Sequence, residues 1–322
     1  MPEISVVTPF YNTAAYLGAC IESVLAQSFG DFEYLLVDNA SDDGSLEIAR
    51  DFAKRDRRIR VVHYDALIPQ IPNYNRALRL IDPDTRFCKI AQADDLLLPR
   101  CLEDMRARAR EDEEIGLVCA YTLLQDHVFL DGLEFFETTL PGEELLRRYL
   151  QDGPYLLGNP TSHLYRTRDV LETAPFFPET GVIADAEAAL RLVLGRRFGF
   201  VHQVLSFARR GNESISDTTR DYNINVLTRR VLLEKYGHAA LDEHEVLHWR
   251  RVLRWRHARV LAEGWLRRRG EPFWDFHRKG LADCGLTILP MELMLGVLMV
   301  LGRLPLNLEG MFRTVWSPGH RS

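Results

Sequence analysis

Residues 87–99 read FCKIAQADDLLLP, an apolar run that ends in two adjacent acids, Asp94 and Asp95. The run 87–91 predicts a buried strand, and the fixed φ of Pro99 suits the first turn of a helix. Acids at this point are placed to meet a substrate, because the carboxyl ends of strands in an α/β sheet open onto the ligand crevice. The alternative is that both acids cap the helix expected near Pro99.

Strands and helices alternate around this stretch. The expected strands are 4–8, 32–37, 59–64, 87–91 and 115–121. Helices are expected between them, beginning for example at Ser45 and spanning about 73–81 and 102–111. This order predicts an α/β fold with a mostly parallel sheet, flanked by helices and connected by right-handed crossovers.

Two strands of the expected sheet end in acids on the same edge. The strand 32–37 continues into Asp38 and Asn39, and the strand 87–91 leads to Asp94 and Asp95. The loop after the first strand, which contains Pro9 and Tyr11, is expected beside them. Either loop alone could be an ordinary turn, for which Asp, Asn, Ser and Gly are the usual residues. Together they predict a site where carboxylates bind Mg²⁺ or a similar hard cation alongside a diphosphate.

The sequence resembles the family 2 glycosyltransferases, which have a GT-A (Rossmann-like) fold. The resemblance rests on ISVVTPFYN from residue 4, FEYLLVDNASDDGS from residue 32 and AQADD from residue 91, and it covers roughly 3–215. It implies an inverting transfer from a nucleotide-diphosphate sugar, with a UDP-sugar as the expected donor. The residues implied on the base are Pro9, Tyr11, Asp38 and Asn39, with Asp94 near the ribose and Asp95 on a Mn²⁺ or Mg²⁺ ion.

The resemblance also implies a catalytic base. A helix is expected over 183–192, with Asp185 and Glu187 in its first turn. An inverting transfer needs a base that takes the proton of the acceptor hydroxyl. The family motif, usually Glu-Asp or Gly-Asp, assigns this role to Asp185. Compensation of the helix dipole is the alternative for the same residue.

Three further residues are weaker candidates for diphosphate or acceptor contacts. Arg209 and Arg210 begin RRGNESIS, which resembles the family's closing loop, and either could screen phosphate charge. His163 falls in a region that lies beside the sugar and acceptor in the family. A satisfied strand residue is the alternative for His163.

Three positions depart from the family pattern. Asn39 stands where many relatives have a second Asp, so the preference for uracil is open. Gln92 replaces the first Asp of the common Asp-x-Asp-Asp form, and Tyr74 stands where Arg is frequent.

Length and composition predict two parts: a catalytic domain over 1–216 and a helical extension over 217–322. The net charge is −12 over 1–228 and +6 over 229–279, and the acidic front argues against nucleic acid as a partner. Five scattered cysteines indicate reduced core thiols. The N-terminus shows no secretion signal, which predicts a cytoplasmic protein.

The C-terminal extension combines arginines, tryptophans and an apolar run over 286–302. That run is interrupted by Glu292 and is too short to predict a spanning helix. Residues 229–302 could rest as a peripheral element on the anionic inner face of a membrane and meet a lipid-linked acceptor. Alternatively, the apolar run packs on the catalytic domain or on a second copy in a homodimer.

Two other functions compete with transfer to a glycan or lipid-linked acceptor. A nucleotidyltransferase would have a Gly-rich loop with a basic residue after the first strand, and the loop at 9–13 contains no glycine. A non-catalytic scaffold that binds a nucleotide-sugar shares the fold and stays open.

Overall fold

The computed structural model describes residues 1–209 and 222–302. The chain divides into two compact units, Met1–Asp217 with Ala239–Leu241, and Thr218–His238 with Asp242–Ser322. The domain boundary expected at residue 216 lies among residues 210–221, outside the described range, and stays a prediction.

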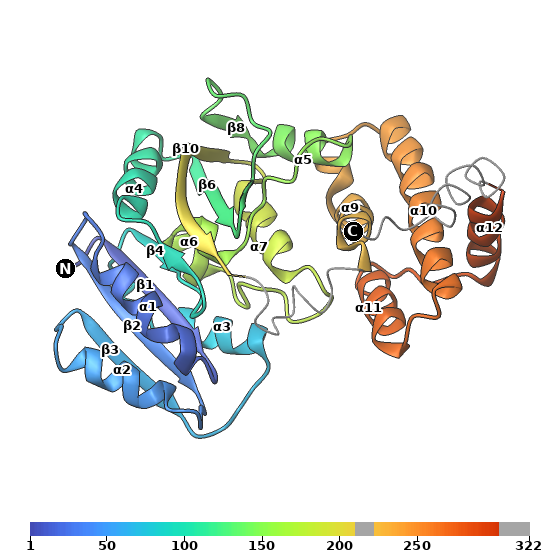
Figure 1. Cartoon of the computed structure of the whole chain (residues 1–322). Helices are drawn as coiled ribbons and strands as arrows, with labels where there is room; N and C mark the ends of the chain where they lie inside the picture. The colour runs from blue at the N-terminus through green and yellow to red at the C-terminus, as the bar shows by residue number, and fades with distance from the viewer. Residues whose placement is uncertain (210–221, 303–322) are drawn as a thin grey trace, which may run out of the picture. The chain divides into compact units, whose positions relative to one another are not determined.

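A sheet organises the first unit, and Figure 1 shows its strands between helices. Among the described residues ten strands form it, with the path β3-β2-β1-β4-β9-β6-β10-β5, while β7 pairs with β6 and β8 with β10. The strands are β1 (Ile4–Phe10), β2 (Phe32–Asn39), β3 (Ile59–Tyr64), β4 (Phe87–Ile90), β5 (Leu96–Leu97), β6 (Ile115–Leu124), β7 (His127–Phe129), β8 (Thr139–Pro141), β9 (His163–Arg166) and β10 (Arg197–Ala208).

The long strands run in one direction. β1 pairs in parallel with β2 and β4, β2 with β3, and β6 with β10. β9 is antiparallel to both β4 and β6, so these two strands point the same way. The prediction of a mostly parallel sheet is confirmed, and the carboxyl ends of β1, β2, β4, β6 and β10 share one edge.

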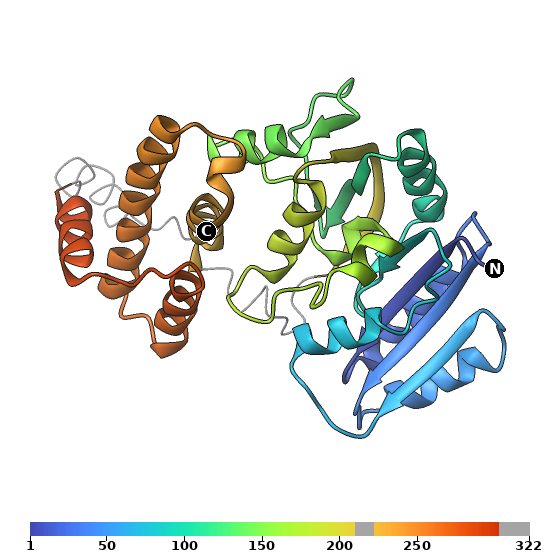
Figure 2. The ribbon, with the colours of Figure 1, turned by 180° about the vertical axis from the view of Figure 1, so that it is seen from behind.

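Helices of the first unit cover the sheet, and α1 and α2 lie on one face of β1, β2 and β3 (Figures 1 and 2). In α1, Leu17, Cys20, Ile21 and Val24 lie on one helical face and are buried in the core. The helices are α1 (Ala14–Leu25), α2 (Ser45–Ala53), α3 (Gln70–Leu78), α4 (Cys101–Glu111), α5 (Gly142–Leu150), the 3₁₀ turn η1 (Pro160–Ser162), α6 (Thr167–Glu172) and α7 (Ala184–Val193). All five cysteines are free, and four of them are buried.

The described part of the second unit is helical, as predicted. Its elements are α9 (Ile224–Tyr236), the 3₁₀ turn η3 (Gly237–Ala239), α10 (Glu243–Leu266), α11 (Glu271–Ala282) and α12 (Pro290–Leu301). Among the described residues, no helix has both the length and the apolar character that crossing a bilayer requires.

Candidate functional site

Hydrogen bonds join the loops that follow β1 and β2. The backbone N–H of Asn12 donates to Ser41 Oγ (3.0 Å), Asn12 Nδ2 donates to Asp42 Oδ1 (2.8 Å), and the backbone N–H of Asp42 donates to Asn12 Oδ1 (3.0 Å). Asn12 has a φ of 48°, which Asn tolerates better than most residues. This arrangement leaves Tyr11 42% exposed, with a ring available for stacking on a base.

Asp38 and Pro9 lie beneath these loops. Asp38 is fully buried, and its carboxylate accepts from the backbone N–H of Ser41 (3.2 Å) and from His63 Nδ1 (2.6 Å). The hydrogen bond that His63 donates to Asp38 raises the pKa of His63. Pro9 is buried within β1, where it pairs in register with Val37. Both residues therefore support the loops from below, and the predicted contacts to a base stay predictions.

Both the oxygen and the nitrogen of the Asn39 side-chain amide are hydrogen-bonded. Its Nδ2 donates to the carbonyl of Ile68 (2.8 Å), and its Oδ1 accepts from the backbone N–H of Ile68 (3.1 Å) and from Arg76 Nη2 (2.9 Å). An amide can make these two hydrogen bonds to the backbone of one residue because it both donates and accepts. Asn stands at this position in place of the family's Asp because its amide bonds both backbone groups of Ile68.

Asn39→Asp is expected to lower the free energy of unfolding at pH 8 by about 1–2 kcal/mol, because a carboxylate would face the Ile68 carbonyl without a donor. Urea denaturation at pH 8 and pH 4 measures this loss. The loss should shrink at pH 4, where a protonated Asp regains a donor. A variant as stable as the wild type at pH 8 would show that pairing with Arg76 outweighs the lost bond.

Asp94 and Asp95 do not cap the following helix, so that alternative is wrong. The chain first forms β5, which pairs antiparallel with β10, and α4 begins only at Cys101 with Arg100 as its N-cap and no side-chain cap. Asp95 is 4% exposed, and burial, together with the charge of Asp94, raises its pKa to about 7. Two adjacent carboxylates in this environment repel each other.

Sequence reasoning missed two residues that position Asp95. Thr161 Oγ1 donates to Asp95 Oδ2 (2.6 Å) from η1. The buried Lys89 in β4 holds this turn in place, because its Nζ donates to the carbonyls of Thr161 (2.6 Å) and His163 (2.9 Å). A lysine within an apolar strand was the available signal for Lys89; nothing in the sequence marked Thr161.

Arg209 completes the surroundings of the two acids from the end of β10. Its backbone N–H donates to Asp95 Oδ1 (3.1 Å), and its Nε donates to the backbone carbonyl of Asp94 (3.2 Å). The guanidinium lies 4.9 Å from the ring centre of Tyr16 in α1. Arg209 thus contacts both acidic residues, and its predicted contact with a diphosphate stays a prediction; Arg210 lies outside the described residues.

The acids suit a divalent cation that a substrate helps to hold. Over residues 1–209 and 222–302, no group of three or more His, Cys, Asp or Glu side chains forms a metal site. Mg²⁺ usually takes only one or two protein carboxylates and completes its shell with phosphate and water oxygens. The repulsion between Asp94 and Asp95 fits that mode, since a cation would relieve it.

Two of the departures from the family pattern contact each other. Gln92 Nε2 donates to the hydroxyl of the buried Tyr74 (3.3 Å), and Thr161 Oγ1 lies 3.3 Å from Gln92 Oε1. The family form places Asp and Arg at these two positions. A neutral pair therefore stands here in place of a charged pair, next to Asp94 and Asp95.

A double-mutant cycle tests whether the pair acts as a unit. Gln92→Asp alone adds a third carboxylate, and Tyr74→Arg alone buries a cation, so each is expected to destabilise the protein. The double variant should recover about 1–3 kcal/mol relative to the sum of the single effects. Four urea denaturation curves give this coupling, and strictly additive effects would contradict it.

Asp185 lies in the first turn of α7, half-buried, where it accepts from the backbone N–H of Ala186 (2.9 Å). Burial raises the pKa of its carboxyl, and its charge, after burial itself, helps to raise the pKa of Tyr155. The Tyr155 hydroxyl donates to the carbonyl of Gly158 (3.1 Å), and Thr161 follows shortly after in the chain. The segment 155–161 therefore connects the surroundings of Asp185 with Asp95.

His163 lies in the core at the start of β9. Its Nδ1 bonds the hydroxyl of Tyr165 (2.7 Å), and its Nε2 bonds the carbonyl of Leu157 (2.5 Å). Burial lowers its pKa to about 3, so it stays neutral. Since both ring nitrogens are engaged and the side chain is buried, the structure favours the satisfied strand residue over a substrate contact.

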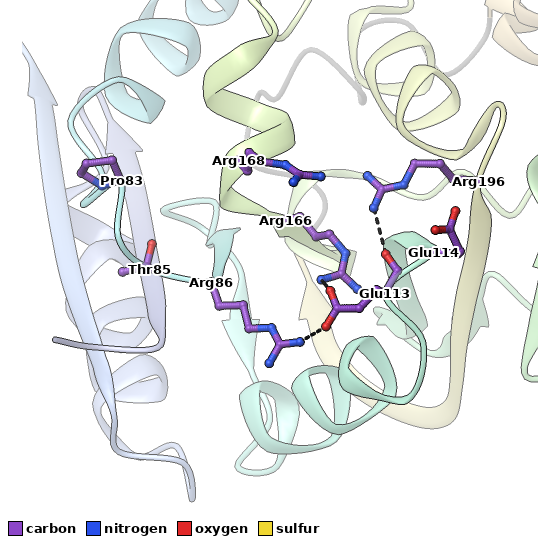
Figure 3. Close-up of a pocket in the computed structure, with 8 residues that line it drawn as sticks. All are labelled: Pro83, Thr85, Arg86, Glu113, Glu114, Arg166, Arg168 and Arg196. Atoms are coloured by element: carbon purple, nitrogen blue, oxygen red, sulfur yellow. Dashed lines mark hydrogen bonds and ion pairs between the residues drawn. The ribbon is translucent and has the colours of Figure 1, made fainter.

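A cavity of about 590 Å³ lies at the opposite edge of the sheet. Its lining, drawn in Figure 3, includes residues that directly precede β4, β6 and β10. Glu113 pairs with Arg86 and Arg166, and Arg196 pairs with Asp169. Arg166 also donates to the carbonyls of Ala109 and Asp112 at the end of α4 (both 3.0 Å). This ion-pair network ties the amino edge together and is separate from the acids at the carboxyl edge.

Comparisons with known proteins agree with the geometry. The model of the family described as "Glycosyl transferase family 2" matches residues 5–170. The glycosyltransferase GlyG of Streptococcus pneumoniae is 25% identical over 228 residues, which cover 68% of this chain and 74% of GlyG.

Solved structures share the fold. TarS 1–349 of S. aureus in complex with UDP-GlcNAc has a TM-score of 0.60 at 19% identity, covering 88% of this chain and 80% of that one. The mannosyltransferase PcManGT from Pyrobaculum calidifontis, in complex with GDP-Man and Mn²⁺, has a TM-score of 0.55 at 19% identity, covering 97% and 82%. The predicted GT-A fold is confirmed.

Proposed function

Because this chain belongs to glycosyl transferase family 2 and is a glycosyltransferase, we propose that it is an inverting enzyme that uses a nucleotide-diphosphate sugar, with a UDP-sugar as the expected donor. The acceptor would be a hydroxyl of a glycan or of a lipid-linked acceptor. The observation that carries this proposal is the pair Asp94–Asp95 at the carboxyl edge of the sheet, in which the buried Asp95 is held by Thr161 and Arg209.

The donor would bind across the loops that follow β1, β2 and β4. In this arrangement the base stacks on the exposed ring of Tyr11, and the ribose lies near Asp94. Asp95 is the protein ligand for Mn²⁺ or Mg²⁺, which when bound supplies positive charge to the leaving diphosphate. Arg209, already bonded to both acids, adds a second positive charge at the same place.

Asp185 would act on the acceptor. Its carboxylate takes the proton of the acceptor hydroxyl as that oxygen forms a bond to the anomeric carbon of the sugar. The bond from that carbon to the diphosphate oxygen breaks, and the diphosphate leaves with the electron pair, which inverts the configuration. A half-buried carboxyl with a raised pKa is a stronger base than an exposed one, which suits this role.

A thermal-shift screen of nucleotide-sugars with Mn²⁺ tests the donor, since a ligand that binds only the folded state raises the melting temperature. We expect a UDP-sugar to give the largest shift and release of UDP to require an acceptor. A nucleotidyltransferase would instead release pyrophosphate from a nucleoside triphosphate. Binding of a nucleotide-sugar without turnover on any glycan or lipid-linked acceptor would favour the scaffold function.

A further inference from the structure

Helix α12 turns its one charged residue inward and leaves several of its apolar residues exposed. Of its residues 290–301, the buried ones are Glu292 and Gly296. Met291, Met294 and Leu298 are 57–58% exposed, and Met299 and Leu301 are also exposed. Surface helices ordinarily turn their apolar side toward the core, so this orientation leaves a large apolar face without a partner in the described part of the chain.

Polar and backbone contacts hold α12 in this orientation. Glu292 lies against Arg254, with which it forms an ion pair, and its other oxygen is 3.9 Å from Arg230 Nη2. A Cβ atom on Gly296 would come within 2.3 Å of the carbonyl oxygen of Ala258 in α10, so glycine permits the close approach of the two helices. A protein is strongly destabilised when one partner of a buried ion pair is left alone. The pairing of Glu292 therefore fixes which side of α12 faces inward.

The outward face is broad and continues onto α10. Positions 291, 294, 298 and 301 recur every three or four residues, with Leu295 and Met299 beside them. An open apolar hollow of about 440 Å³ is lined by Trp255, Leu295, Leu298 and Met299. Arg251 is exposed one turn before Trp255 on α10, so a cation and an indole flank the apolar face.

We propose that this α12 face binds the surface of an anionic phospholipid membrane. Met and Leu side chains would enter the acyl region, Trp255 would lie at the headgroup level, and the surrounding arginines would attract lipid phosphates. At 12 residues α12 is too short to cross the bilayer, so it would lie in the interface. This inference goes beyond the proposed sugar transfer and does not depend on it.

Charge favours lipid over a second copy as the occupant. Residues 222–302 carry thirteen Arg and Lys side chains against nine Asp and Glu. Two such basic units repel each other, whereas each is attracted to a negatively charged leaflet. The three methionines of α12, Met291, Met294 and Met299, adapt to irregular partners such as acyl chains.

Flotation of the full chain with vesicles, without any donor, tests the proposal. We expect the wild type to float with vesicles of phosphatidylcholine and phosphatidylglycerol, less with phosphatidylcholine alone, and less at high salt. Met294→Glu and Leu298→Glu should each reduce the bound fraction about tenfold or more, because each buries a charge in the interface. Leu67→Glu is the matched control: Leu67 is a 55% exposed leucine between β3 and α3 in the first unit, and its variant should float like the wild type.

The proposal is overturned if the wild type floats with neither vesicle, or if Leu298→Glu floats as well as the wild type. Light scattering of the same samples identifies the competing occupant. A wild-type dimer that Leu298→Glu converts to a monomer, without any lipid binding, would assign the face to a second copy. Donor-induced thermal shifts report separately on the proposed function, so the failure of one proposal is not mistaken for the failure of the other.

Discussion

Asp185→Asn is expected to bind the donor as tightly as the wild type and to lose sugar transfer by a factor of about 10² to 10⁴. The amide keeps the size of the side chain and can still accept from the backbone N–H of Ala186, but it cannot take a proton from the acceptor hydroxyl. Donor binding by calorimetry and transfer by release of the nucleoside diphosphate separate the two effects. Full transfer by this variant would show that Asp185 is not the base.

Glu187→Gln is the matched control, because Glu187 lies in the same first turn of α7. If the acids of this turn acted only on the helix dipole, neither variant would lose transfer. Retained transfer in Glu187→Gln together with lost transfer in Asp185→Asn would identify a base. The raised pKa of Asp185 further predicts that the wild-type rate falls on the acid side at a pH above the usual range of an aspartate.

Asp95→Asn is expected to stabilise the metal-free protein at pH 8 by about 1–3 kcal/mol while it abolishes function. The folded protein holds the Asp95 proton up to about pH 7, whereas the unfolded chain loses it near pH 4. Wild-type stability from this group is therefore complete below pH 4 and is lost as the pH rises to about 7. Asn carries no charge and avoids this loss, so the gain should be large at pH 8 and absent at pH 4.

Urea denaturation of both proteins at pH 8 and pH 4, without divalent cations, measures that difference. Asp126→Asn serves as the control, since Asp126 is an exposed acid in the turn between β6 and β7. Its free energy of unfolding should stay within about 0.5 kcal/mol of the wild type. An Asp95→Asn variant that is less stable than the wild type at pH 8 would contradict the buried, repelled carboxylate.

The same Asp95→Asn protein is expected to lose the thermal shift that Mn²⁺ and a UDP-sugar together produce in the wild type, and to lose transfer at least a hundredfold. Stabilisation and loss of function in one variant would mark Asp95 as a residue kept at a cost in stability. An unchanged thermal shift would remove Asp95 from the metal site and leave the family assignment intact.

The sequence predicted most of the catalytic fold because local patterns determine it. Apolar runs ended in acids at β2 and β4, and the rule that strand ends share an edge placed Asp38 and Asp94 correctly on that edge. Prediction from the sequence failed for features that depend on contacts between residues far apart in the chain. The sequence did not predict β5, which forms because Leu96 and Leu97 pair with β10. Thr161 reaches Asp95 across 66 positions, and no local pattern announces such a contact.

The second unit shows a different reason for failure. An apolar run predicts a helix but gives no information on which side of it faces inward when nearly every residue is apolar. In α12 the choice is made by Glu292 and by the small Gly296, through residues of α9 and α10. The sequence could therefore predict a helix here, while its outward apolar face required the structure.

The reversed direction of β9 has a consequence for how this enzyme can diversify. β6 ends at the carboxyl edge, and β9, running the other way, begins at that same edge. Residues 125–162 thus leave the sheet at the end of β6 and return to it at the start of β9, a neighbouring strand. The last turn of this segment supplies Thr161. Because both ends of this segment are fixed at the sheet, the loop between β7 and β8 can change in length and sequence while Thr161 keeps its place beside Asp95.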